Sequence, residues 1–365
     1  MTETADIIVI GGGIAGISAA ADLARDASVL VLEAEDHLGY HSTGRSAAIF
    51  IRNYGNATLK ALNGLSYPLL GGDLLGESVL SPRGEMLVAQ DHELDALDSY
   101  MEGTVGVDRL TGPEACALVP ILRPDRVAAA IIERDAQDID VDRLLQGNAR
   151  LLRERGGRTC SGQRAQTILR RDGVWTVETG KGRFSAPVLV NAAGAWADRV
   201  AALAGVMPIG LQPMRRSAVL MAVPDTLRGS PEWPLFGSIS DGWYAKPDGT
   251  RLMISPADED PVEPQDAWPD DMVLAEGLYR FEQMVDLPIV RPSHSWAGLR
   301  SFVADRTPVV GFAPDAEGFF WLAAQGGYGV QTAPALAGIT GDLCRSGGQK
   351  IDPALVQALS PSRLA

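Results

Sequence analysis

The feature that most constrains this chain is a glycine-rich turn close to its N-terminus. The sequence GGGIAG at residues 11–16 matches the pattern GxGxxG, and it directly follows Asp6–Ile10, a continuous β-rich run typical of a central parallel strand. A helix is predicted over Ile14–Arg25, and a second buried strand over Ser28–Leu32 ends at Glu33. This order of strand, turn, helix, strand and acid indicates a βαβ unit that binds a dinucleotide.

Each position in this unit has a physical reason. Gly11 permits the tight turn, Gly13 lets the backbone approach a pyrophosphate, and Gly16 lets the helix pack closely on the strand. The N-terminus of the helix attracts the phosphate charge, and Glu33 can accept hydrogen bonds from the adenosine ribose. An acid at that position indicates a ribose without a 2′-phosphate, which leaves both NAD and FAD open.

The loop GYHSTGRSAA at residues 39–48 bears on this choice. Its hydroxyls and backbone donors can wrap the second half of a dinucleotide. Taken alone, the loop is equally consistent with an ordinary solvent-exposed segment. The segments further along the chain decide between NAD and FAD.

Charge and composition exclude several classes of protein. The formal net charge of −14 has the wrong sign for a protein that binds nucleic acid or an anionic membrane. Cys116, Cys160 and Cys344 are dispersed and odd in number, which fits a reducing cytoplasm, and neither they nor the 4 histidines have the spacing of a metal site. The first residues carry acids and no basic run, so we expect neither a signal peptide nor a transmembrane segment there.

Four segments together resemble the family of FAD-dependent D-amino-acid oxidases and dehydrogenases, which includes glycine and sarcosine oxidases. They are the glycine turn, the loop HSTGRSAA, the segment VLVNAAGAW at 188–196 and the segment QGGYGVQT at 325–332, in that order. Within the family, the sequences of these motifs are most similar to those of bacterial D-arginine dehydrogenases. The shared segments include LSPRGEM, LQPMRRSA, WYAKPD and WAGLRSFVADRTPVVG, and they extend from residue 5 to about 335.

The cofactor motifs are discontinuous, at residues 6–48, 186–198 and 298–332, whereas an NAD-type Rossmann domain keeps them in one block. The expected fold class is therefore α/β: a Rossmann-like FAD-binding domain with a discontinuous, antiparallel-sheet (α+β) substrate domain. We assign residues 1–80, 138–210 and 291–365 to the FAD-binding domain, and residues 81–137 and 211–290 to the substrate-binding domain. The acid-rich stretch Asp258–Asp271 is expected to be a solvated loop, or else a surface that steers cationic substrates.

The resemblance implies FAD bound noncovalently, since no cysteine lies beside a cofactor motif, and it implies no metal. The residues expected to bind FAD are Gly11, Gly13, Ile14, Ala15, Gly16, Glu33, Ala34, His41, Ser42, Thr43, Gly44, Arg45, Ser46, Ala47, Ala193, Gly194, Trp196, Gly326, Tyr328, Gly329, Val330 and Gln331. Of these, His41 is expected to order the cofactor loop rather than to act as a base.

The resemblance also implies a site for an α-amino acid. Arg216 and Arg300 match the positions that bind the substrate carboxylate, for which the planar guanidinium is suited. Tyr54 and Tyr244 match hydroxyl donors to the same carboxylate. The motif does not decide whether Arg216 or its neighbour Arg215 binds the carboxylate, because the register of the match is uncertain by one residue.

Two further positions concern the amine and the side chain of the substrate. Gly327 lies where the family holds the amine with a backbone carbonyl, and Glu85 matches the carboxylate that binds a basic side chain. The D-arginine enzymes have a histidine where Ile49 stands and an apolar residue where Arg52 stands. Both changes predict a retained but weakened preference for basic side chains. We expect Arg52 to point outward, because burying an unpaired guanidinium costs several kcal/mol.

The resulting hypothesis is an enzyme that deaminates D-amino acids oxidatively, by hydride transfer from Cα to the flavin. The imino acid then hydrolyses to a 2-oxo acid and ammonia. The resemblance implies a quinone or another acceptor rather than chiefly dioxygen, and a cytoplasmic protein that meets the inner membrane only through that acceptor. The alternatives are a glycine- or sarcosine-type amine oxidase, a 2-hydroxy-acid dehydrogenase, and a non-catalytic flavin-binding protein. A monomer is compatible with the sequence, which leaves the oligomeric state open.

Overall fold

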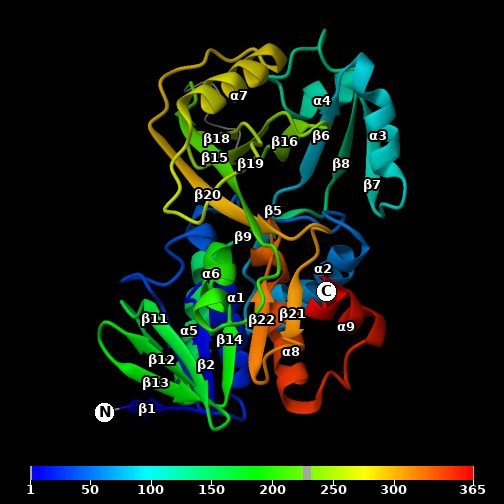
Figure 1. Cartoon of the computed structure of the whole chain (residues 1–365). Helices are drawn as coiled ribbons and strands as arrows, with labels where there is room; N and C mark the ends of the chain where they lie inside the picture. Colours follow the sequence, from blue (N-terminus) through cyan, green and yellow to red (C-terminus); the bar gives the residue numbers. More distant parts are fainter. Residues whose placement is uncertain (1, 225–231, 365) are drawn as a thin grey trace.

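The computed structural model describes residues 2–224 and 232–364, and two large sheets dominate it (Figure 1). The lower, six-stranded sheet has the order β10 (Arg158–Cys160), β3 (Val29–Leu32), β2 (Ile7–Ile10), β14 (Val188–Asn191), β22 (Phe319–Ala323) and β21 (Val309–Phe312). Its strands are parallel except for β21, which runs antiparallel to β22. The parallel Rossmann-like sheet predicted from the glycine turn is therefore present, and the predicted α/β fold class is confirmed.

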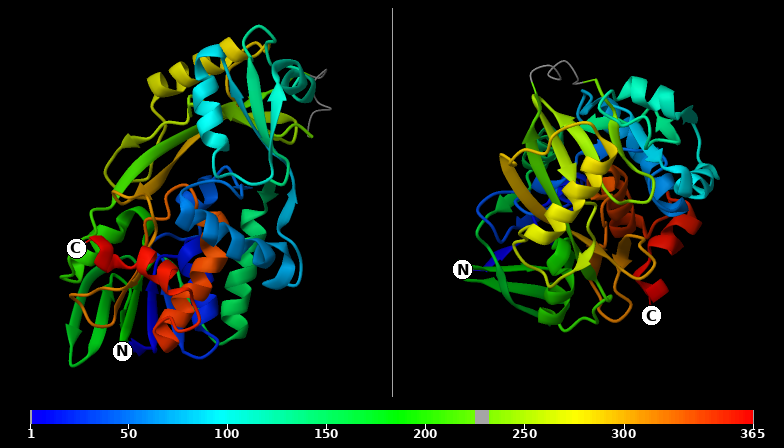
Figure 2. Two further views of the ribbon diagram at one scale, coloured as in Figure 1. Left: turned by 90° about the vertical axis from the view of Figure 1, so that its right-hand side faces the viewer. Right: turned by 90° about the horizontal axis from the view of Figure 1, so that it is seen from above.

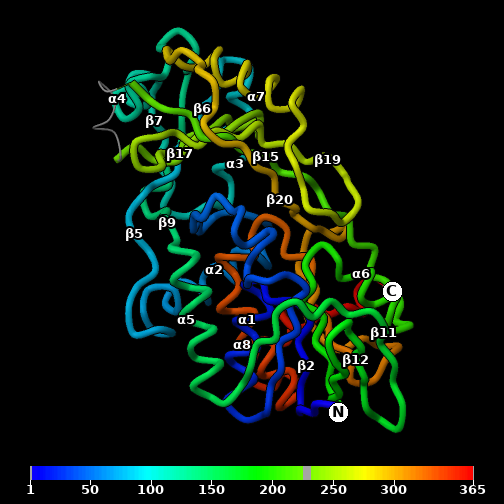
Figure 3. Tube along the Cα trace, turned by 90° about the vertical axis from the view of Figure 1, so that its left-hand side faces the viewer, coloured from blue at the N-terminus to red at the C-terminus, as the bar shows by residue number. Residues whose placement is uncertain are grey.

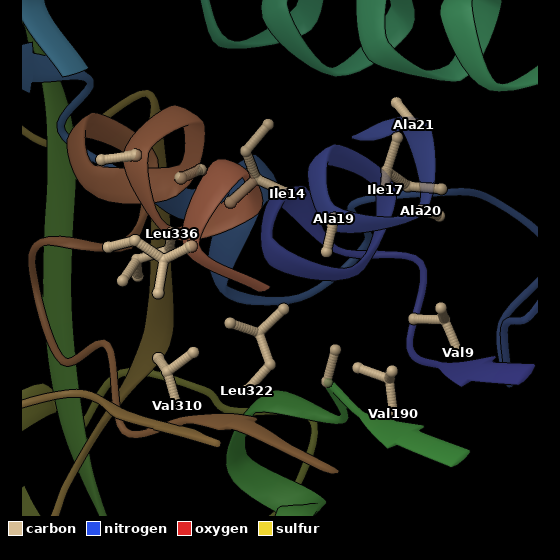
Figure 4. Packing of buried hydrophobic residues seen from close by; sticks show 14 of the residues in the cluster. Val9, Ile14, Ile17, Ala19, Ala20, Ala21, Val190, Val310, Leu322 and Leu336 are labelled. Carbon is tan, nitrogen blue, oxygen red and sulfur yellow. The ribbon is translucent and has the colours of Figure 1, made fainter. Parts of the chain in front are cut away.

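Both faces of this sheet are buried, as its uninterrupted apolar strands require. On one face, Val9 and Val190 pack against Ile17 and Leu336 beneath the helices (Figure 4). These helices are α1 (Ile14–Leu23), α2 (Ala57–Pro68), α5 (Val141–Glu154) and α8 (Gly329–Ser346). The opposite face, which includes Ile8, is covered by helix α6 and a four-stranded sheet. These elements are α6 (Ala197–Leu203), β1 (Thr2–Thr4), β13 (Arg183–Ala186), β12 (Val174–Thr179) and β11 (Ala165–Arg171).

The upper sheet has nine strands and is antiparallel apart from one pair. Its order is β19 (Asp260–Pro261), β15 (Gln212–Ala222), β18 (Arg251–Ser255), β17 (Tyr244–Asp248), β16 (Leu235–Ser238), β6 (Glu85–Ala89), β8 (Ala129–Glu133) and β7 (Val107–Thr111), with β20 (His294–Phe302) on the far side of β15. The exception is the parallel pair β16–β6, which joins segments far apart in the chain. The sequence predicts only antiparallel pairing here, because hairpin patterns reveal local partners alone.

Strand β20 departs from the predicted division of the chain. It lies within 291–365, the range that we assigned to the FAD-binding domain, yet it pairs with β15 along its whole length in the nine-stranded sheet. Such pairing is not visible in a sequence pattern, since the two strands are far apart in the chain. The division into two domains otherwise stays a prediction.

Smaller elements connect and cover the two sheets. A three-stranded sheet lies between them, formed by β4 (Ile49–Phe50), β9 (Gln137–Ile139) and β5 (Leu80–Pro82). The outer face of the nine-stranded sheet is covered by α4 (Gly112–Leu118) and α7 (Asp271–Met284), which Figure 2 shows from above. The remaining helices are α3 (Leu94–Met101) and α9 (Pro353–Leu359). Within residues 2–224 and 232–364, no helix combines the length and apolarity needed to cross a membrane.

Candidate active site

A single cavity of about 490 Å³ runs from the glycine turn to the inner face of the nine-stranded sheet. Gly11 and Glu33 line one end of it, and Glu85 and Tyr244 line the other. Its walls come from the beginning, the middle and the end of the chain, which the tube in Figure 3 shows folding back on one another. The discontinuous motifs of the sequence thus form one continuous site.

The glycine turn has the geometry that its residues predict. Gly11 has a φ of 112°, and a Cβ atom there would lie 2.3 Å from the carbonyl oxygen of Ala192. A Cβ on Gly16 would lie 2.0 Å from the carbonyl oxygen of Gly11. At Gly13 the same atom would meet only the Thr43 hydroxyl, at 3.3 Å, so space is left on the cavity side. Helix α1 begins at Ile14, whose N–H donates to the Thr43 hydroxyl at 3.0 Å; its N-cap residue, Gly13, has no side chain, and this end of the helix lines the cavity, where it is suited to a phosphate.

The carboxylate of Glu33 lines the cavity and also orders the turn. One of its oxygens accepts a hydrogen bond from the backbone N–H of Gly12 at 2.5 Å, and the other accepts from the N–H of Glu35 at 2.8 Å. Lone pairs on both oxygens remain for a ribose.

The predicted cofactor loop is a 3-10 turn, Ser42–Arg45, that joins the two sheets. The Ser42 hydroxyl donates to the carbonyl oxygen of Leu299 at 2.6 Å, and the Arg45 guanidinium donates to that of Ala297 at 3.0 Å. His41 lies with its Nε2 3.2 Å from Glu35 Oε1 and its ring centroid 4.5 Å from that of Trp196. This placement supports an ordering role for His41.

Most of the residues predicted to bind FAD line the cavity, and three do not. Gly16 packs against Gly11, and the N–H of Gly44 donates to the carbonyl oxygen of Gly39 at 2.8 Å. Tyr328 is buried with its ring centroid 4.7 Å from that of Tyr54. The residues on either side of Tyr328 line the cavity, whereas the Tyr328 ring packs against those of Tyr54 and Phe302.

Strand alternation settles which member of the arginine pair faces the cavity. Successive residues of β15 point to opposite faces, and Arg216 lines the cavity whereas Arg215 does not. Arg215 instead pairs with Asp260 at 2.7 Å. The Arg216 guanidinium lies 6.0 Å from the centre of the Tyr244 ring, and it donates to the carbonyl oxygen of Asp258 at 2.7 Å and to Glu259 at 3.0 Å.

Arg300 on β20 is the cavity arginine best placed to bind an anionic ligand. Within the described residues it forms no salt bridge, although it lines the cavity. Burial opposes its charge, yet the phenols of Tyr244 and Tyr54 hold the pKa of its guanidinium above the usual value. Burial likewise opposes ionisation of Tyr244, but Arg300 and Arg216 outweigh it and lower the pKa of the Tyr244 hydroxyl. The three side chains therefore form a positively charged end wall, to which Tyr54 adds a fourth hydrogen-bonding group.

Gly327 lies against this wall, as the predicted amine-binding position requires. A Cβ atom on Gly327 would lie 3.1 Å from a terminal nitrogen of Arg300, so only glycine leaves the guanidinium undisturbed. The backbone of this residue therefore runs close to the guanidinium, beside the place where a carboxylate would bind.

Glu85 on β6 faces the cavity and is 9% exposed. Burial, and then the charges of Glu133 and Asp241, raise the pKa of the Glu85 carboxyl to about 8. No described cation forms a salt bridge with it; the nearby Arg83 pairs with Asp138 instead, at 2.6 Å. An acid left without a cation in a buried site favours a positively charged ligand.

Two neighbours of the site behave as the sequence predicts. Ile49 lines the cavity and supplies no polar group. Arg52 is exposed and lies with its guanidinium 5.1 Å from the centre of the Tyr67 ring, outside the cavity.

Most of the acid-rich stretch is exposed, as expected of a solvated loop, but its first acids have partners within the protein. Asp258 is buried, and its carboxylate accepts hydrogen bonds from the backbone N–H and the hydroxyl of Ser217 at 2.6 and 2.8 Å. With Asp260 it holds the β15 arginines in place. Asp258, Glu259 and Asp260 thus compensate the charges of two half-buried arginines, a role that composition does not reveal.

Several cavity residues were missed in the sequence. Asp241 lies in the β16–β17 turn with a φ of 54°, and the dipeptide Asp-Gly at 241–242 was the available signal. Gln163, Arg164 and Ala165 follow β10, which lies next to the strand that ends at Glu33. No local pattern marks them, since only the parallel pairing of β10 with β3 brings them to the site.

Comparison with known proteins agrees with this geometry. Residues 6–343 match the model of the family described as "DAO: FAD dependent oxidoreductase". The chain belongs to this family of FAD-dependent oxidoreductases.

Relatives within the DAO family differ in what their names say they act on. The chain is 24% identical to glycine oxidase of Geobacillus kaustophilus, over 94% of this chain and 93% of that protein. It is 26% identical to γ-glutamylputrescine oxidoreductase of Escherichia coli over 53% of this chain, and this match spans only 50% of the relative. Among solved structures, L-proline dehydrogenase from P. horikoshii superposes with a TM-score of 0.86 at 25% identity, covering 100% of this chain and 98% of that one.

The residues present fit the FAD that the DAO family binds. The side-chain nitrogen of Gln325, which lines the cavity after β22, is buried without a hydrogen-bond partner and so is free to donate to a ligand. The space at Gly13, the N-terminus of α1 and the carboxylate of Glu33 provide for the pyrophosphate and the ribose. FAD, rather than NAD, is thus the cofactor, as predicted.

We expect the flavin of this DAO-family protein to be noncovalent. Acid precipitation should release all of it into the supernatant, and Gly16→Ala should reduce the FAD content severalfold, because the added Cβ would force the turn away from α1. The measurement is flavin absorbance per mole of protein. Gly64→Ala, at a helical position with open space, is the matched control. Flavin that remained with the precipitate would contradict the prediction.

Proposed function

We propose that this protein oxidises D-amino acids at Cα, with broad side-chain tolerance and a retained but weakened preference for basic side chains. The proposal rests on one observation: two ionisable side chains of opposite sign line the same cavity, and neither has a partner of the other sign in the part of the chain that the structure describes. The Arg300 guanidinium lacks a carboxylate partner among the described residues, and Glu85 lacks a cation. An α-amino acid with a positively charged side chain supplies both.

The arginines and tyrosines would hold the substrate carboxylate. Arg300 offers a forked guanidinium, and Tyr244 and Tyr54 offer hydroxyls from neighbouring walls of the cavity. Arg216 contributes positive charge, while Glu259 occupies part of its hydrogen-bonding capacity. Anchoring the carboxylate fixes the orientation of Cα, and such positioning is a large part of catalysis.

The amine would be held by the carbonyl of Gly327 in its neutral form. A cavity lined by an arginine pair disfavours an ammonium group, so the substrate loses a proton on binding. Bound FAD would supply the acceptor for the hydride that leaves Cα. No strong protein base is then needed, which agrees with the ordering role of His41. The imino acid, once released, hydrolyses in water to a 2-oxo acid and ammonia.

The D configuration, the similarity to D-arginine dehydrogenases and the use of a quinone or another acceptor rest on the shared motifs, of which the loop at 39–48 and the segment at 325–332 are the longest around the cofactor. A cytoplasmic location is supported by the three cysteines, which are free. A quinone acceptor would bring the protein to the inner membrane without a transmembrane segment.

Oxidation of glycine, sarcosine or a 2-hydroxy acid is the second candidate. The name of the Geobacillus relative, glycine oxidase, favours it, and Arg300 would hold the carboxylate of these compounds equally well. Glycine and sarcosine have no side chain, and D-lactate has only a methyl group that cannot pair with an acid, so these substrates would leave the buried Glu85 carboxyl without a partner.

Anaerobic reduction of the flavin separates the candidates. The yellow holoenzyme should bleach with D-Arg, D-Lys, D-Met and D-Leu, faster with the basic pair, and should stay yellow with L-isomers, glycine, sarcosine and D-lactate. Bleaching by glycine or D-lactate alone would replace the proposal by the second candidate. Because dioxygen is absent, the result does not depend on the natural acceptor.

A further inference from the structure

Glu133 on β8 holds a segment that forms part of the cavity wall, Ile51–Gly55, which contributes Ile51 and Tyr54 to the lining. One carboxylate oxygen of Glu133 accepts the backbone N–H of Arg52 at 2.6 Å. The other accepts the backbone N–H of Asn53 at 3.3 Å and its side-chain amide at 2.6 Å. Glu133 is 4% exposed and Asn53 is 5% exposed, so these hydrogen bonds form away from solvent.

Asn53 extends this contact to a third element. Its side-chain oxygen accepts the N–H of Val105 at 3.0 Å, and its side-chain nitrogen donates to the carbonyl of Val105 at 2.9 Å, in the loop between α3 and β7. The carbonyls of Ile51, Arg52 and Tyr54 are held from the opposite side by the amide of Asn63 on α2. The segment is therefore clamped between the helices of the FAD-binding half and the nine-stranded sheet.

The same Glu133 is the cross-strand partner of Glu85. The two residues face each other in the β6–β8 ladder, where Cβ atoms of paired residues lie about 4.5–5.5 Å apart. Asp241 from the β16–β17 turn and Tyr100 from α3 are the other titratable groups beside Glu85. Above its pKa of about 8, an ionised Glu85 without a cation repels the carboxylate that holds Ile51–Gly55, and a cation between them removes the repulsion.

We propose that Asn53 and Glu133 form a positioning pair that sets Tyr54 against the cavity, and that a cationic side chain bound at Glu85 tightens this pair. Asn53 would then favour basic substrates without touching them. The first half stands on the contacts of the segment alone, whereas the tightening rests on the proposed function.

Hydrogen exchange of the holoenzyme tests the first half without any substrate. Glu133→Gln should speed exchange of the backbone amides of residues 52 and 53 by roughly tenfold or more, because an NH2 group replaces one of the two oxygens that accept from them. Asn53→Ala should have a similar effect, because it removes the side-chain hydrogen bonds to Glu133 and Val105 that hold the segment. Glu154→Gln, which removes a charge at the exposed end of α5, is the matched control and should change nothing there. Unchanged exchange in both variants would overturn the positioning pair, whether or not any D-amino acid is a substrate.

Steady-state kinetics tests the tightening. Asn53→Ala should raise the KM for D-Arg by roughly tenfold and that for D-Leu much less, with a smaller change in kcat. Asn53→Asp keeps the shape of the side chain but places a second carboxylate against Glu133, so it should raise the KM for D-Arg more than Asn53→Ala does. When Glu85→Gln is combined with Asn53→Ala, the KM values for D-Arg and D-Leu should no longer differ. A purely structural role would lower the melting temperature and affect D-Arg and D-Leu equally, and that outcome would overturn the tightening.

Discussion

We expect Arg300→Met to lower kcat/KM for D-amino acids by about 30- to 1000-fold while the FAD content stays normal. Arg300 lines the substrate end of the cavity and has no salt bridge within the described part of the chain. Its full charge would therefore be available to the substrate carboxylate. Losing one charge-assisted, forked contact in a site shielded from water costs roughly 2–4 kcal/mol, which corresponds to that range of rates.

The matched control is Arg251→Met, on β18 of the same sheet, where the side chain is exposed and pairs with Asp248 at 3.4 Å. It should leave kcat/KM unchanged. Arg216→Met should reduce kcat/KM less than Arg300→Met, since Glu259 already engages Arg216. If Arg300→Met behaved like the control, the substrate carboxylate would have to bind elsewhere.

The second large effect concerns selectivity. Glu85→Gln should lower kcat/KM for D-Arg relative to D-Leu by roughly 10- to 150-fold, because a charge-assisted contact of a partly buried pair is worth about 1.5–3 kcal/mol. Glutamine keeps the size of the side chain, so the efficiency with D-Leu should change little. Arg52→Val is the control at the rim, since Arg52 lies outside the cavity over Tyr67. Should D-Glu prove the best substrate and Arg52→Val abolish its oxidation, the assignment of Glu85 would be wrong.

Glu85 also predicts a pH dependence. Burial, Glu133 and Asp241 raise the pKa of its carboxyl from its ordinary value of 4.5 to about 8 in the folded protein. The folded state thus binds the proton more tightly than the unfolded state, so stability should fall as the pH rises from 4.5 to about 8 and then level off. Over the same range Glu85 becomes ionised, so the KM for D-Arg should fall more steeply than that for D-Leu, whose fall reflects only the loss of the proton from the substrate amine.

Melting temperatures and KM values measured from pH 5 to pH 9 check both statements. Glu85→Gln should remove the component of each slope that wild type shows between pH 6 and pH 8, and D-Arg should protect wild type against the loss of stability at higher pH. Identical profiles for wild type and Glu85→Gln would show that the carboxyl does not titrate in this range.

Much of the cofactor site could be predicted because its signals are local. A strand, a glycine turn and a helix are contiguous in residues 6–25. The positive φ of Gly11 and the close approach at Gly16 allow few other backbone conformations for the turn. The segment at 325–332 is also local: it joins the apolar strand Phe319–Ala323 to helix α8, which begins at Gly329, so its glycines mark the point where a parallel strand gives way to a helix.

What the amino-acid sequence determined by itself, then, was the class of cofactor, the parallel sheet and the types of side chain that line the cavity. The tertiary structure alone decided which of those side chains meet one another. Long-range pairing of β15 with β20 brings Arg216 and Arg300 to one wall, and the β6–β8 register sets Glu85 beside Glu133. The hold of Glu133 on Asn53 likewise joins residues 80 positions apart. Local sequence patterns indicate backbone conformation and burial. Which charged side chains meet depends instead on strand register and on packing between segments that are distant in the chain.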